Sequence, residues 1–63
     1  TLISAARNHA EADIAVHKAN IEVYMQQVVG IGEHSDIVET IQKELDKMAA
    51  ATDRLEMLNE HFS

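Results

Sequence analysis

Glycine is confined to one short stretch near the middle of the chain. The 63-residue sequence has two glycines, Gly30 and Gly32, and no proline. Both residue types interrupt helices, and glycine commonly follows a helix's last turn. The long stretches on either side contain neither residue and are rich in helix formers. We therefore expect an all-α chain that reverses its direction once.

The two helices are predicted at about residues 2–28 and 36–62. The connection between them is short enough to force antiparallel neighbours. Asp36 is the expected cap of the second helix, because an aspartate side chain accepts a hydrogen bond from a free amide of the first turn. The predicted fold is an antiparallel two-helix hairpin that forms one domain, residues 1–63.

Apolar residues recur three and four positions apart in both helices, which is typical of helices packed lengthwise. In the first helix, the face expected to meet the second comprises Ile3, Ala10, Ile14, His17, Ile21, Tyr24 and Val28. In the second helix, the expected face comprises Val38, Ile41, Leu45, Met48, Thr52, Leu55, Asn59 and Phe62, with Ile37, Ala51 and Leu58 along one edge and Ala49 along the other. His17 is then expected to bond across the bundle.

The first helix carries a second apolar stripe on its far side, which we call the second stripe. It consists of Leu2, Ala5, Ala12, Val16, Ala19 and Val23. Ordering so small a chain costs about 90 kcal/mol of conformational entropy, which its own burial barely offsets. Disulfides are excluded because the chain has no cysteine. We therefore predict a homo-oligomer, with a dimer favoured, in which two hairpins form a four-helix bundle with the second stripe as interface.

The net negative charge of the chain makes some classes of binding partner unfavourable. Eleven acidic and five basic residues give a formal charge of −6. This charge repels nucleic-acid phosphate and anionic lipid, so neither direct nucleic-acid binding nor membrane binding is expected. The sequence also lacks an apolar run of roughly 20 residues, the length that spans a bilayer. These features predict a cytoplasmic protein.

The residues that could carry chemistry are few. His9, Asp13 and His17 are spaced four apart, so they form a ladder on one helix that could present metal ligands. The spacing lacks the Glu-x-x-His arrangement of di-iron bundles, and this metal-binding bundle stays the alternative hypothesis. Ser35 and Asp36 are explained by helix capping, so no catalytic set and no cofactor is predicted.

The glycine stretch is interpreted as a structural turn around an apolar residue. Ile31 lies between Gly30 and Gly32. Burying it at the end of the bundle would gain roughly 1.5 to 3 kcal/mol. Ile31 is thus expected to plug that end, and otherwise it is the most plausible contact for a binding partner.

Two segments give the chain a resemblance to a group of known proteins. They are Val23-Tyr24-Met25 and Val29-Gly30-Ile31-Gly32-Glu33-His34-Ser35-Asp36-Ile37. They resemble small hypothetical proteins of tailed, T4-like bacteriophages, including marine ones, over about a quarter of the chain. The resemblance implies a phage or host-cytoplasm setting and no activity. The leading hypothesis is a non-enzymatic, self-associating helical protein that binds an unidentified protein partner.

Overall fold

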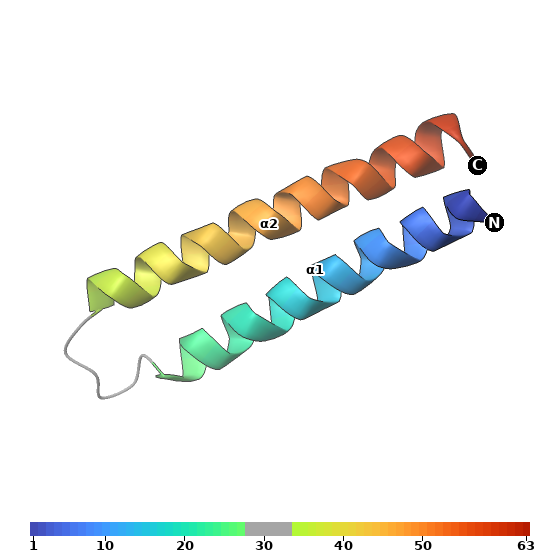
Figure 1. The fold of residues 1–63 in the computed structure, drawn as a ribbon. Coiled ribbons are helices and arrows are strands. Elements are labelled where there is room, and N and C mark those ends of the chain that lie inside the picture. The colour runs from blue at the N-terminus through green and yellow to red at the C-terminus, as the bar shows by residue number, and fades with distance from the viewer. Residues whose placement is uncertain (28–33) are drawn as a thin grey trace.

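The computed structural model describes residues 1–27 and 34–63. It has two helices, α1 (Leu2–Gln27) and α2 (His34–His61), which run antiparallel and pack along their length (Figure 1). The molecule is a rod of 47 × 14 × 12 Å with both termini at the same end. The predicted all-α hairpin is confirmed. The predicted turn residues Gly30, Ile31 and Gly32, and Val28, lie outside the described residues.

The N-terminal turns of the two helices are stabilised in different ways. Thr1 caps α1, because its Oγ1 accepts a hydrogen bond from the amide of Ser4 at 3.1 Å. The predicted cap of α2 at Asp36 is wrong, because α2 begins at His34 and Asp36 already lies in its first turn. There its carboxylate still suits the positive end of the helix macrodipole. Its backbone carbonyl oxygen accepts a hydrogen bond from Thr40 Oγ1 at 2.9 Å.

The face that α1 turns toward α2 is the predicted one. Its least exposed residues are Ile3, Arg7, Ala10, Ile14, His17, Ile21 and Tyr24, together with Asp13 and Asn20 on one edge. Every described apolar residue of the predicted face is among them. Arg7 fills the gap between Ile3 and Ala10 and donates from Nε to Asn59 Oδ1 at 2.9 Å.

The face that α2 turns toward α1 is shifted from the predicted one toward the edge that Ile37, Ala51 and Leu58 form. Its members alternate four and three apart and are Ile37, Ile41, Glu44, Met48, Ala51, Leu55 and Leu58. Val38, Leu45 and Phe62 were expected in this face, but about half or more of each is exposed. Ile37, Ala51 and Leu58, which were predicted along one edge, lie within the observed face, and Glu44 is its one unpredicted member. Glu44 belongs there because side chains of α1 satisfy its carboxylate.

Only alanines are completely buried among the described residues. Ala10 is 1% exposed and Ala51 is 0% exposed, and no larger side chain is fully buried. Ala10 lies two turns before His17, and Ala51 lies two turns after Glu44. Since His17 meets Glu44, the antiparallel register brings the two alanines to the same level. Small side chains there let the helix backbones approach closely.

Enlarging Ala10 tests this close approach. We expect Ala10→Leu to lower the free energy of unfolding by about 1 to 3 kcal/mol, because the added methyl groups must push the helices apart. Each kcal/mol corresponds to roughly 4 to 8 °C in the melting temperature of a domain of this size. Thermal unfolding followed by circular dichroism measures the effect. Ala49→Leu on the exposed side of α2 is the control, and equal melting temperatures for both variants would contradict the packing.

Candidate functional site

The polar centre of the hairpin is a hydrogen-bonded group formed by three side chains. His17 Nδ1 lies 2.5 Å from Glu44 Oε2, and Asn20 Nδ2 donates to the same oxygen at 3.3 Å. The His17 and Glu44 side chains are only 19% and 12% exposed. The expectation that His17 bonds across the helices is therefore confirmed, and its partner is a carboxylate within the seam.

This group changes the acidity of Glu44. The hydrogen bond from His17 lowers the pKa of the Glu44 carboxyl below its ordinary value, and Asn20 and the charge of Lys47 act in the same direction. Partial burial opposes them and raises the pKa, but less strongly. The ionised form of Glu44 is thus the form that the fold favours.

The three predicted metal ligands, His9, Asp13 and His17, do not converge on one point, because they contact different partners. His9 Nδ1 lies 3.2 Å from Asp13 Oδ2, and Arg54 also reaches Asp13 Oδ2 through a guanidinium nitrogen at 3.0 Å. His17 is engaged with Glu44 instead. Among residues 1–27 and 34–63, no three His, Cys, Asp or Glu side chains gather in a way that could hold a metal ion.

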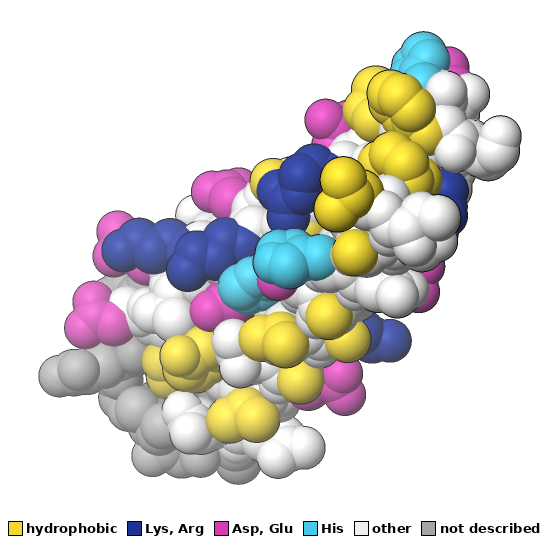
Figure 2. Space-filling view, turned by 45° about the vertical axis from the view of Figure 1, so that its right-hand side comes forward, with side chains coloured by type: hydrophobic (Ala, Val, Ile, Leu, Met, Phe, Trp, Pro, Cys, Tyr) yellow, Lys and Arg dark blue, Asp and Glu magenta, His cyan; other side chains and the backbone are white. Residues whose placement is uncertain are grey.

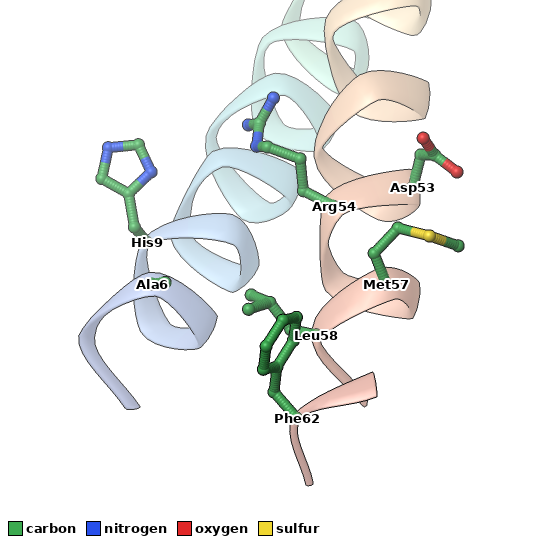
Figure 3. A pocket seen from close by; sticks show the side chains of 7 residues that line it. All are labelled: Ala6, His9, Asp53, Arg54, Met57, Leu58 and Phe62. Atoms are coloured by element: carbon green, nitrogen blue, oxygen red, sulfur yellow. The ribbon is translucent and has the colours of Figure 1, made fainter. Parts of the chain in front are cut away.

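A pocket opens at the end of the hairpin that carries the termini, and we call it the terminal pocket. Its volume is about 450 Å³, and it is lined by Ala6, His9, Asp53, Arg54, Met57, Leu58 and Phe62. Figure 3 shows Leu58 and Phe62 extending into the space between the two helices, with Arg54 reaching toward α1. The lining combines apolar side chains with one histidine, one aspartate and one arginine.

The second stripe is exposed in the hairpin. Leu2, Val16 and Val23 are 89%, 53% and 51% exposed, and the three alanines of the stripe are exposed as well. At about 100° per residue, the stripe lies on the same side of the rod as the Asp13–Arg54 pair and the terminal pocket. Figure 2 shows hydrophobic side chains along the hairpin on this side, with histidine and basic side chains among them.

His9 belongs to this surface, whereas its spacing from Asp13 and His17 predicts a metal ligand. With His9 included, the stripe reads Leu2, Ala5, His9, Ala12, Val16, Ala19 and Val23, and its spacing alternates strictly between three and four. That is the heptad pattern of a helix that packs on another helix. The spacing was available from the sequence, and only the polarity of His9 hid it.

Neither described helix is long and apolar enough to cross a membrane. Comparison of the chain with protein-family models, with curated proteins and with solved structures gave no match.

The Glu44 group predicts a specific pH dependence of stability. Because the folded protein binds the proton of Glu44 more weakly than the unfolded chain does, its stabilising effect is complete above the ordinary pKa of glutamate. The effect is lost as the pH falls through the lowered pKa of the folded state. We expect Glu44→Gln to remove this part of the acid sensitivity in unfolding curves measured from pH 7 to pH 3.

Glu56→Gln is the matched control, because Glu56 lies on the same helix and is exposed. It should leave the acid sensitivity unchanged. Equal slopes of stability against pH for the wild type and Glu44→Gln would show that the Glu44 group does not stabilise the fold.

Proposed function

We propose that this chain is a non-enzymatic helical protein that acts through self-association and as a protein-interaction module. Its interface with a second copy is the second stripe. The cytoplasmic setting, and the phage or host-cell setting that the resemblance of the turn segment implies, are parts of the same proposal. The observation that carries it is the exposed apolar second face of α1.

The lack of a closed core supports this function. Two helices in contact share a single seam, and within residues 1–27 and 34–63 only two alanines are fully buried. A compact protein of 7.0 kDa exposes about 4,000 Å². The hairpin exposes 4675 Å². This excess of roughly 600 Å² approaches the approximately 800 Å² that each partner buries in an ordinary interface.

The distribution of charge also favours association through α1. No Asp, Glu, Lys or Arg occurs in the second stripe from Leu2 to Val23. Charged residues, which are costly to bury, are depleted from the centres of protein interfaces. The opposite side of the rod exposes the apolar residues Val38 and Leu45 of α2. The next positions at the same spacing on that helix are the polar Thr52 and Asn59. That side offers a shorter apolar surface.

Analytical ultracentrifugation tests the proposal. We expect the wild type to sediment at micromolar concentration with twice its mass of 7.0 kDa, and its melting temperature to rise with protein concentration. Val16→Glu should abolish both effects, because it places a carboxylate in the apolar interface.

Leu45→Glu is the matched control, since Leu45 is 48% exposed and lies on the opposite side of the rod. This variant should still associate. A wild type that is a folded monomer at all concentrations would refute self-association. Dissociation caused by Leu45→Glu alone would place the interface on the other side.

A further inference from the structure

The direction in which two hairpins pack can be inferred from the order of large and small residues in the second stripe. In the heptad notation, Leu2, His9, Val16 and Val23 occupy the a positions, and Ala5, Ala12 and Ala19 occupy the d positions. Each a residue is larger than each of these d residues. The stripe therefore alternates between large and small along α1.

A parallel pairing of two α1 helices would place like against like. Each Val16 would face Val16 of the second copy, and each Ala12 would face Ala12. The valine layers would hold the helices apart, and the alanine layers would then leave voids, which are costly. Parallel pairing would also bring the two His9 rings together, at the level where Asp13 of each chain is already shared between His9 and Arg54.

An antiparallel pairing places a positions against d positions. In the register that overlaps the whole stripe, Ala12 faces Val16 of the second copy and Ala5 faces Val23. His9 faces Ala19, and Leu2 faces Gln26. Every apolar layer then combines one large and one small residue. All these layers can therefore be filled at the same distance between the two helices. The same pairs recur when the two copies are exchanged, as a two-fold axis requires.

We propose that a second copy of this chain covers the second stripe with its α1 antiparallel, in the register that pairs Ala5 with Val23. This inference rests on the proposed self-association and adds its orientation. It places His9 at the border between the interface and the terminal pocket. The ring keeps its contact with Asp13 there, and Asp53 and Arg54 of α2 line the same pocket.

Disulfide cross-linking tests the orientation, and the absence of native cysteines makes the result unambiguous. Two full-length variants, Ala5→Cys and Val23→Cys, are prepared separately and mixed in equal amounts under mild oxidation. Both positions are exposed in the hairpin, so the folded state should tolerate both changes. Circular dichroism before oxidation checks this.

In the antiparallel pairing, most of the covalent dimer in the mixture should join one Ala5→Cys chain to one Val23→Cys chain, as mass spectrometry identifies. Each variant alone should give little covalent dimer, because 18 residues separate the two equivalent cysteines by about 27 Å along the helix. Abundant dimer from each variant alone would establish parallel pairing and overturn the inference, while leaving self-association intact.

Sedimentation of the reduced variants separates the remaining outcomes. Dimeric mass without cross-linking in the mixture would show that the copies associate through another surface, which overturns this inference alone. Monomeric wild-type protein at every concentration would overturn the proposed function together with it.

Discussion

Ala10 and Ala51, the fully buried residues of the described helices, lie at the same level of the hairpin, and their small size limits what the seam can bury. Side chains with no atoms beyond Cβ allow a short separation but contribute little apolar area. The larger residues along the seam, such as Ile14 and Leu55, therefore stay partly exposed at its edges. The hairpin gains a defined register from its helix contact and leaves large apolar side chains such as Val16, Val23 and Leu45 about half exposed.

The hydrogen bonds among His17, Asn20 and Glu44 make the alignment of the two helices specific, which the small alanine side chains alone do not. A partly buried carboxylate needs partners, and they are present only when Glu44 lies level with α1 residues 17 and 20. Sliding α2 by one helical turn would leave the charge without its hydrogen bonds. The polar group thus penalises alternative alignments that the apolar residues alone would tolerate.

The same group explains which parts of the fold could be predicted from the sequence. The face of α1 was found because only Arg7 and His17 interrupt its apolar spacing, and Arg7 itself was missed. The face of α2 was displaced because Leu45 fits an apolar pattern better than Glu44 does. The side chains that hydrogen-bond to Glu44 are on the other helix. The spacing of residues within α2 alone therefore cannot reveal that Glu44 is partly buried. The exposed stripe was recognised, but His9 was left out for the same reason of polarity.

The position of the two termini has a consequence for how such a rod can be joined to other structures. Both ends of the chain lie together at one tip of the rod, beside the terminal pocket. Anything attached to either end is therefore held at that tip, while the two helices extend away from it along the rod. An attachment at either terminus would therefore hold the hairpin at one end and leave the sides of both helices accessible along their length.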